Sequence, residues 1–321
     1  MGKYRNAGET RRRKYVSINC KQRGREKTEG AGVLNNRGTD EFSARVITVN
    51  GKVTAAQHRC MAEAAEKFGN GNLTYTTRLS VEIQGIPYEK IEEFQEFIAK
   101  EGLETGGTGA KVRPVVSCKG TTCQYGLLDS YAISEEIFRR FYKGYRQVAL
   151  PHKFKIAVGG CPNNCVKPNL NDVGIIGQRI PHFDREACKG CKKCAIEAAC
   201  PNKVAKVVDG KLHIDEELCR HCGRCVGKCP FHSIPDGTYG FKIYIGGRWG
   251  KKISHGKALN RIFTSEEEAL DVIEKAILLF KDQGLKGERF AETIERIGFE
   301  NAEKQLLEKN LLERKMEILS K

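Results

Sequence analysis

The chain has 321 residues, fourteen of them cysteine, and a formal net charge of +15 at pH 7. Its length and its 40% hydrophobic content suit a globular protein with more than one core. No apolar run approaches the ~18 residues that cross a bilayer. The basic N-terminus precedes no apolar stretch either, so we expect no membrane segment, no signal peptide and a cytoplasmic location. The charge favours anionic partners: a small oxyanion, an acidic electron-donor protein or nucleic acid.

The first predicted segment is a flexible basic tail over residues 1–41. Lysine and arginine are mixed there with glycine, asparagine and threonine, as in Arg11-Arg12-Arg13-Lys14, and apolar residues show no period. The composition fits a solvated tail and a docking arm equally well. Because the tail lacks interleaved aromatic residues and no recognised binding module follows it, a nucleic-acid-binding protein is the weakest hypothesis.

Residues 42–109 are predicted to form a ferredoxin-like half-domain. The apolar pattern predicts strands over 44–49, 73–76 and 80–84, and helices over 53–68 and 87–100. The order β-α-β-β-α is most of a ferredoxin-like split unit. A glycine-rich segment, 103–109, leads out of it.

A second domain of α/β type is predicted over residues 110–182 and 237–321, so the fold class is mixed α+β and α/β. Strands are expected over 112–117, 154–158, 173–176 and 241–245, and helices over 134–145 and from residues 265, 288 and 301. Residues 183–236 interrupt this domain with eight cysteines. We therefore expect an inserted domain rather than an appended one.

The eight cysteines of residues 183–236 have the spacing of two ferredoxin-type [4Fe-4S] sites. Each run begins Cys-x2-Cys-x2-Cys and is closed by Cys-Pro, and each run should give its last cysteine to the other cluster. The runs are Cys188, Cys191, Cys194 and Cys200, then Cys219, Cys222, Cys225 and Cys229. A zinc site is the alternative. Disulfides are not expected, because cytosolic thiols stay reduced, and several clusters together suggest an anaerobic host.

A third group of cysteines has a different spacing. Cys118 and Cys123 follow one predicted strand, and Cys161 and Cys165 follow another within Gly-Gly-Cys-Pro-Asn-Asn-Cys. Four thiolates gathered from the ends of two strands can hold a further [4Fe-4S] cube at the edge of a sheet. Buried free thiols are the alternative.

This third group resembles the cluster site of the sirohaem-containing sulfite and nitrite reductases, which is a cysteine pair, a long gap and Cys-x3-Cys. In that family the last cysteine bridges a cluster iron to the sirohaem iron, so the resemblance implies that Cys165 is the bridge. The first pair has four intervening residues where the family usually has five. The implied cofactors are sirohaem and three [4Fe-4S] clusters.

Basic residues upstream of these cysteines resemble the substrate cations of the same family. The segment ending in Thr76-Thr77-Arg78 is similar to its Thr-x-Arg motif, and Lys153 and Lys155 are similar to its Lys-x-Lys strand. Lysines spaced by two on a strand point to one face. The resemblance implies that four cations bind a doubly charged oxyanion and that the lysines supply protons. The four are Arg78, Arg113, Lys153 and Lys155, and Gly246, Gly247 and Arg248 resemble the family's contact with the sirohaem carboxylates.

The resemblance implies a low-molecular-weight or subunit-type sulfite reductase, similar to the catalytic subunit of anaerobic sulfite reductases. Electrons would pass through the two ferredoxin-type clusters to the coupled cluster, cross Cys165 to sirohaem, and reduce sulfite by six electrons to sulfide. A sirohaem nitrite reductase that makes ammonia is the first alternative, although Lys155 favours sulfite, because nitrite-preferring relatives often have an amide there. A non-catalytic polyferredoxin-type electron carrier is the second, and sirohaem content distinguishes it from the enzymes.

Larger relatives carry two similar halves, with substrate cations from one half and cluster cysteines from the other. This chain holds both sets in a single half. We therefore expect a homodimer, or a hetero-oligomer with a related subunit, that completes the pocket. The expected electron donor is an acidic protein or subunit.

Overall fold

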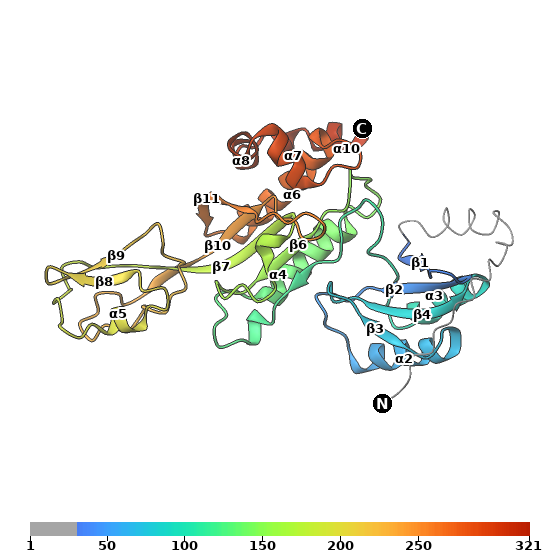
Figure 1. Ribbon diagram of the computed structural model, residues 1–321, viewed down its shortest axis with the longest axis horizontal. Helices are drawn as coiled ribbons and strands as arrows, with labels where there is room; N and C mark the ends of the chain where they lie inside the picture. Colours follow the sequence, from blue (N-terminus) through green and yellow to red (C-terminus); the bar gives the residue numbers. More distant parts are fainter. Residues whose placement is uncertain (1–30) are drawn as a thin grey trace, which may run out of the picture.

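The computed structural model describes residues 31–321, so the arginine-rich segment Arg11 to Lys14 lies outside the described residues. Figure 1 shows two sheets with their helices and a lobe, carrying α5, β8 and β9, that projects from the larger sheet. The mixed fold class predicted from the sequence is confirmed. Within residues 31–321, no helix combines the length and the apolar character needed to cross a membrane.

The N-terminal sheet is antiparallel, with the strand order β1-β2-β4-β3. Thr54 caps α2, because its side chain accepts a hydrogen bond from the Gln57 N–H while the Gln57 side chain accepts one from the Thr54 N–H. The order of elements agrees with the predicted β-α-β-β-α unit. These elements are β1 (Val33–Asn35), β2 (Glu41–Val46), α2 (Ala55–Phe68), β3 (Leu73–Tyr75), β4 (Val81–Pro87) and α3 (Ile91–Ala99).

One boundary in this region was wrong. The flexible tail was predicted to reach residue 41, but residues 33–35 form β1 and pair with β2. Val33 is buried in the core under that sheet. The strand is only three residues long and is flanked by glycine and asparagine, so its apolar pattern is too short to detect without its partner strand.

The larger sheet has the strand order β11-β10-β7-β6-β5, with β5, β6 and β7 parallel and β7, β10 and β11 antiparallel. Strand β5 is shorter than the predicted 112–117, because Pro114 has no N–H for the ladder, and Val112 keeps only an isolated bridge to Phe154. The strands are β5 (Val116–Ser117), β6 (Ile156–Gly159), β7 (Val173–Pro181), β10 (Gly237–Ile245) and β11 (Lys257–Phe263).

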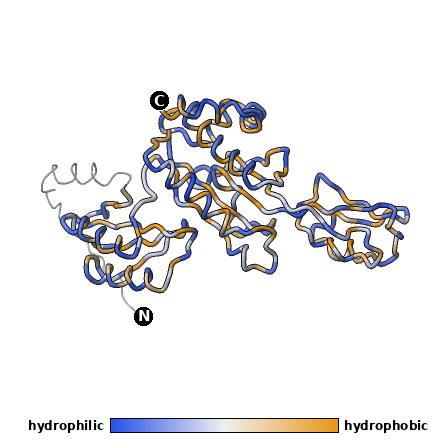
Figure 2. The backbone as a smooth tube through the Cα atoms, turned by 180° about the vertical axis from the view of Figure 1, so that it is seen from behind, coloured by the Kyte–Doolittle hydropathy of each residue, from blue (hydrophilic) through white to orange (hydrophobic). Residues whose placement is uncertain are grey.

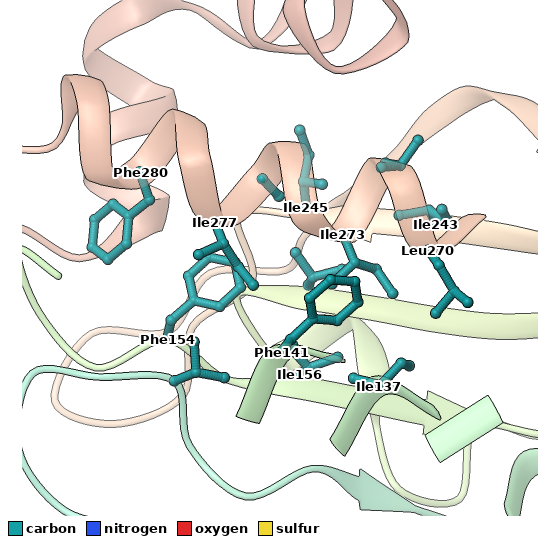
Figure 3. Packing of buried hydrophobic residues seen from close by; sticks show 14 of the residues in the cluster. Ile137, Phe141, Phe154, Ile156, Ile243, Ile245, Leu270, Ile273, Ile277 and Phe280 are labelled. Atoms are coloured by element: carbon teal, nitrogen blue, oxygen red, sulfur yellow. The ribbon is translucent and has the colours of Figure 1, made fainter. Parts of the chain in front are cut away.

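Helix α6 covers this sheet. It begins after Ser265, whose side chain accepts a hydrogen bond from the Glu268 N–H, and acidic residues in its first turn suit the positive end of the helix dipole. Figure 3 shows its apolar side chains lying over those of the sheet, and Figure 2 shows hydrophobic segments concentrated in the same region. The helices of this domain are α4 (Ser130–Ile137), which continues as a π-helix to Lys143, α6 (Glu266–Gln283), α7 (Phe290–Ile297), α8 (Phe299–Leu307), α9 (Asn310–Glu313) and α10 (Lys315–Ser320).

Phe154 fixes the segment between β5 and β6 to the core. Its ring lies 5.8 Å from the ring of Phe280 and 5.2 Å from the ring of Phe290, measured between centroids, and it is fully buried. Such aromatic contacts add about 0.5–1.5 kcal/mol each to the burial of the rings. The residues on either side of Phe154 therefore face away from this core.

The lobe leaves the larger sheet at the end of β7 and returns at the start of β10. These two strands pair continuously from Val173 opposite Ile245 to Pro181 opposite Gly237. The intervening residues 182–236 form α5 (Ala195–Ala199) and the hairpin of β8 (Ala205–Val208) and β9 (Lys211–Ile214). They pack around a small core of their own that includes Ile196, Leu212 and Ile234.

Candidate cluster sites and anion pocket

Two neighbouring parallel strands bring the third group of cysteines together. Cys118 directly follows β5, and Cys161 follows β6 after Gly160. The carboxyl ends of parallel strands lie at the same edge of a sheet. Burial raises the pKa of the Cys161 thiol, and the thiols of Cys118, Cys165 and Cys123 raise it further. The two predicted pairs therefore lie in one group.

The surroundings of this group fit an iron-sulfur cluster. The Gly160 N–H donates a hydrogen bond to the Cys118 sulfur at 3.1 Å. A Cβ atom on Gly120 or on Gly160 would lie 2.8 Å from the Cα of the other, so the two loops approach closely only because both residues are glycine. Among residues 31–321 the buried Ser117 hydroxyl has no hydrogen-bond partner, so it could donate to a cluster sulfur.

Cys165 differs from the other three cysteines of this group in its exposure. Its side chain is exposed, whereas Cys118, Cys123 and Cys161 are partly buried. A thiolate that faces outward can contact a second group on the far side of a cluster. The exposure of Cys165 fits the predicted bridge to a sirohaem iron.

In the lobe, the second run of cysteines is joined by the last cysteine of the first run. These four cysteines line one small cavity; they are Cys200, Cys219, Cys222 and Cys225. Burial raises the pKa of Cys225 to about 11, and the neighbouring thiols of Cys219, Cys222 and Cys200 also raise it. This is the exchange of cysteines between runs that two ferredoxin-type clusters require.

The other cysteines of the lobe lie around its small core. Cys188, Cys194 and Cys229 all contact this core, and the Leu212 N–H donates a hydrogen bond to the Cys188 sulfur at 3.4 Å. The Ser233 hydroxyl is fully buried and has no hydrogen-bond partner of regular geometry. Together with backbone N–H groups, this hydroxyl lowers the pKa of Cys229 against the effect of burial. Buried donors beside a thiolate fit a cluster ligand.

No three or more His, Cys, Asp or Glu side chains within residues 31–321 converge closely enough to hold a single metal ion. A [4Fe-4S] cube binds each cysteine at a different iron, so its four ligands lie further apart than the ligands of one ion.

The predicted Lys-x-Lys pair lies on the face opposite to Phe154. Within the described residues, the ammonium groups of Lys153 and Lys155 form neither an ion pair nor a hydrogen bond. Burial, together with the positive charges of Arg78 and Arg289, lowers the pKa of Lys155 to about 8. The pKa of Lys153 is lowered in the same way. Because neither ammonium group has a partner within the described residues, both lysines can bind an anion.

Arg78 is placed differently from the two lysines. Its guanidinium donates to the Pro114 carbonyl at 2.6 and 3.0 Å, to the Ile156 carbonyl at 2.9 Å and to Asn171 Oδ1 at 3.0 Å. Guanidinium has five N–H groups, so these four hydrogen bonds leave one for an anion. Burial lowers the pKa of Arg78 to about 10. Arg78 connects the loops around the pocket and has little capacity left for a ligand.

Arg113 belongs to the same group of cations, because its charge acts on both Lys153 and Arg78. Its guanidinium donates to the Gly107 carbonyl, and its buried Nε has no hydrogen-bond partner within residues 31–321. Burial, together with the charge of Arg45, lowers the pKa of Arg113 to about 10. An unpaired buried donor on a cation fits an anionic ligand.

Sequence reasoning missed two residues that lie among these cations, Asp172 and Arg289. The Arg289 guanidinium lies 3.0 and 3.1 Å from the two carboxylate oxygens of Asp172, which is fully buried. Asp172 also accepts a hydrogen bond from the Lys155 backbone N–H at 2.8 Å. Burial raises the pKa of Asp172 and the charge of Arg289 opposes this rise. Asp172 thus lies among more cations than carboxylates, which leaves this group of side chains with net positive charge.

The predicted Gly-Gly-Arg segment packs against the loop that follows Cys165. The Gly246 N–H donates to the Asp172 carbonyl at 3.0 Å. A Cβ atom on Gly247 would lie 2.3 Å from the Asn171 carbonyl oxygen, so only glycine allows this approach. The Arg248 guanidinium forms an ion pair with Glu292 at 2.6 Å. The segment belongs to the same site, with Arg248 already paired to a carboxylate.

Grouped cysteines together with a cluster of cations are typical of an iron-sulfur protein. Comparison with known families identifies the class further. Residues 108–315 match the nitrite and sulphite reductase 4Fe-4S domain, and residues 35–101 match the nitrite/sulfite reductase ferredoxin-like half domain. The chain belongs to the nitrite and sulphite reductase family, which is a family of oxidoreductases, and the predicted resemblance is confirmed.

Three relatives show how the chain compares in length. It is 32% identical over 269 residues to an uncharacterized protein of Methanocaldococcus jannaschii, covering 84% of this chain and 92% of that protein. It is 29% identical over 240 residues to the coenzyme F420-dependent sulfite reductase of the same organism, covering 74% of this chain but only 37% of the relative. With one subunit of the anaerobic sulfite reductase of Salmonella typhimurium it shares 29% identity over 147 residues, which is 41% of this chain and 42% of the relative.

Solved structures share the fold. Dissimilatory sulfite reductase I superposes with a TM-score of 0.66 at 23% identity, over 83% of this chain and 69% of that one. The NirA protein of Mycobacterium tuberculosis superposes with a TM-score of 0.63 at 19% identity, over 90% of this chain and 46% of that one.

Proposed function

We propose that the chain is the catalytic part of a sirohaem-dependent sulfite reductase, which reduces sulfite by six electrons to sulfide. The observation that carries this proposal is the position of Lys153 and Lys155, two ammonium groups without partners in the described residues, among the cations Arg78, Arg113 and Arg289. The loop that carries Cys165 reaches this group, because Asp172 at its end accepts a hydrogen bond from the Lys155 backbone N–H. Sirohaem, bound through Cys165, would supply the iron that binds sulfite and receives the electrons.

The residues of the pocket have separable tasks. Lys153 and Lys155 would bind the sulfite oxygens through charge-assisted hydrogen bonds and donate protons as these oxygens leave as water. A pKa of about 8 keeps Lys155 mostly protonated at neutral pH while making proton release easier than from an ordinary lysine. Arg113 would add a charged donor, and Arg78 would hold the surrounding loops in place. Gly246, Gly247 and Arg248 would contact the sirohaem carboxylates.

The cysteine sets would hold three [4Fe-4S] clusters. The lobe, residues 183–236, would be an inserted ferredoxin-type domain with two of them, and Cys118, Cys123, Cys161 and Cys165 would hold the third. Electrons would pass from the lobe to the third cluster and across Cys165. A cavity of about 560 Å³ supports this direction, because it is lined by Cys219 and Cys222 of the lobe and by Asn163 and Asn164, which lie between Cys161 and Cys165.

A sirohaem nitrite reductase that makes ammonia is the second candidate, because the matching family includes enzymes for both anions. The electron count is the same. Lys155 favours sulfite, because a second ammonium group suits a doubly charged oxyanion better than a singly charged one. A polyferredoxin-type carrier would need no sirohaem.

The pocket would be completed by a second copy of the chain or by a related subunit. The match to the F420-dependent relative covers 74% of this chain but only 37% of that relative, so further polypeptide accompanies such a domain there. Light scattering of the active protein tests this proposal. A monomer with full turnover would refute it.

The deciding experiment uses protein made anaerobically alongside sirohaem synthesis. We expect a sirohaem absorption spectrum that shifts on adding sulfite. The variants Lys153→Gln and Lys155→Gln should lose about 100-fold or more in turnover while keeping this spectrum. The matched control is Lys251→Gln, an exposed lysine in the loop after Arg248. Absence of sirohaem would refute the enzyme in favour of a carrier, and faster turnover of nitrite would favour the second candidate.

A further inference from the structure

The two cysteine sets of the lobe lie at different distances from the larger sheet. Cys222 forms a bridge with Arg179 of β7, and the Arg179 N–H donates to the His221 carbonyl at 2.7 Å. The second set, Cys200 with Cys219, Cys222 and Cys225, therefore lies at the base of the lobe, next to the sheet.

The first run of cysteines lies at the other end of the lobe. Gly190, between Cys188 and Cys191, packs so closely on the turn between β8 and β9 that a Cβ atom would lie 1.7 Å from the Gly210 carbonyl oxygen. The Lys211 ammonium group also donates to the Cys188 carbonyl at 2.8 Å. Helix α5 separates the sets, because Cys194 precedes it and Cys200 follows it. The set of Cys188, Cys191, Cys194 and Cys229 is thus remote from the pocket.

Exposed lysines surround this remote set. Three lie in the loop between Cys188 and Cys194, and one precedes Cys229. Adjacent Cα atoms are only 3.8 Å apart, so each lysine starts within one or two such steps of a cysteine. None forms an ion pair within residues 31–321. These residues are Lys189, Lys192, Lys193 and Lys228.

An apolar group lies next to the same set. Pro230 and Phe231 directly follow Cys229, and the Phe231 side chain is 47% exposed. The acidic run of the lobe, Asp215 to Glu217, instead precedes Cys219 at the base. An apolar contact close to the redox group and charges around it are the features that a small, transient electron-transfer interface uses. We call Lys189, Lys192, Lys193, Lys228, Pro230 and Phe231 the lysine patch.

We infer that the lysine patch is the docking site of a small acidic electron-transfer protein. The inference rests on the proposed function, and it adds where on the chain the electron donor binds and that the donor is negatively charged. Four unpaired ammonium groups attract a negatively charged partner and raise its association rate at low salt. One electron would then pass from the reduced donor to the [4Fe-4S] cluster that the remote set would hold, and no bond would form or break and no proton would move.

The test compares two electron sources for the loaded protein. Reduced methyl viologen is a small cation that needs no docking site, and a small acidic ferredoxin represents the proposed donor. The variant Lys192→Gln/Lys193→Gln is compared with Lys203→Gln/Lys206→Gln, which removes two other exposed lysines of the lobe near its second set. The patch variant should raise the KM for reduced ferredoxin by about 3- to 10-fold at low salt and weaken its salt dependence. The control variant should leave the KM and its salt dependence unchanged. Neither variant should alter turnover with methyl viologen.

Several results would overturn the inference. An unchanged KM for ferredoxin in the patch variant would do so, and so would an equal effect of the control variant. Loss of binding to duplex DNA or to anionic vesicles, with an unaffected ferredoxin KM, would assign the patch to another partner. Failure of the proposed function is distinguishable, because wild-type protein would then reduce no sulfite even with methyl viologen, while binding of the acidic ferredoxin could still be titrated by calorimetry.

Discussion

The pKa of Lys155 gives a prediction that joins the geometry of the pocket to its chemistry. Burial and the charges of Arg78 and Arg289 lower this pKa to about 8. A group with that pKa is about 90% protonated at pH 7 and about 10% protonated at pH 9. If the protonated lysine binds sulfite, kcat/KM and sulfite affinity should fall about tenfold over this range, because kcat/KM reports the protonation of the free enzyme.

The control for this prediction is Lys155→Arg, which stays mostly charged up to pH 9, because burial lowers the pKa of neighbouring arginines only to about 10. Dividing the wild-type kcat/KM or affinity by that of this variant also removes the effect of the ionisation of sulfite itself. Arg78 and Arg113, each with a pKa of about 10, remain mostly charged at pH 9 and contribute little to the fall. Lys153→Arg separates the second lysine, whose pKa is also lowered.

The assay is a sulfite titration of the sirohaem spectrum from pH 7 to pH 9 at constant ionic strength, together with steady-state kinetics. We expect the ratio of wild type to Lys155→Arg to fall about tenfold from pH 7 to pH 9, because Lys155 loses its proton over this range and the arginine does not. A wild-type affinity that does not change with pH, or an identical fall in Lys155→Arg, would refute the role assigned to Lys155.

Three further predictions concern residues around the clusters and the pocket. Arg289→Leu should lower the free energy of unfolding by about 3–5 kcal/mol, because it leaves the carboxylate of Asp172 buried without its ion-pair partner. Adding Asp172→Asn should recover part of this loss in denaturant titrations. Cys200→Ser should remove about four irons per chain and abolish the same cluster that Cys219→Ser abolishes. Iron analysis and electron paramagnetic resonance would show both effects. A resonance signal that matches that of Cys191→Ser would contradict the exchange of cysteines between runs. Ser233→Ala should lower the reduction potential of the Cys229 cluster by removing a donor to its sulfur, and a redox titration that finds no shift would contradict this role.

Much of the fold follows from local patterns in the sequence. Helix α2 has both a capping box and an apolar face, so its start and its type could be predicted. The hairpin of β8 and β9 was missed although Asp209-Gly210 is a typical turn signal between two apolar segments. Strand β11 was missed because Asn260 and Arg261 interrupt its alternation, and only its pairing with β10 defines it.

The candidate site also has a part that the sequence predicts and a part that only the fold reveals. Cysteine spacing predicts a ligand set because cluster ligands come from short loops. Asp172 and Arg289 are 117 residues apart, and no local pattern indicates that they meet. The bonds of Arg78 to the Pro114 and Ile156 carbonyls depend on where two strands end, so its connecting role became visible only from the fold.

The attachment of the lobe has a consequence for how such a protein can change over time. Pro181 and Gly237 are neighbours in the ladder of β7 and β10, so the chain leaves the sheet and returns to it at adjacent positions. Removing residues 182–236 would require only a turn to join the two strands, and insertions are tolerated where chain ends lie close together. A lineage could therefore gain or lose the lobe in one genetic step while the larger sheet stays intact. Under the proposed function, such a step would exchange one electron donor for another.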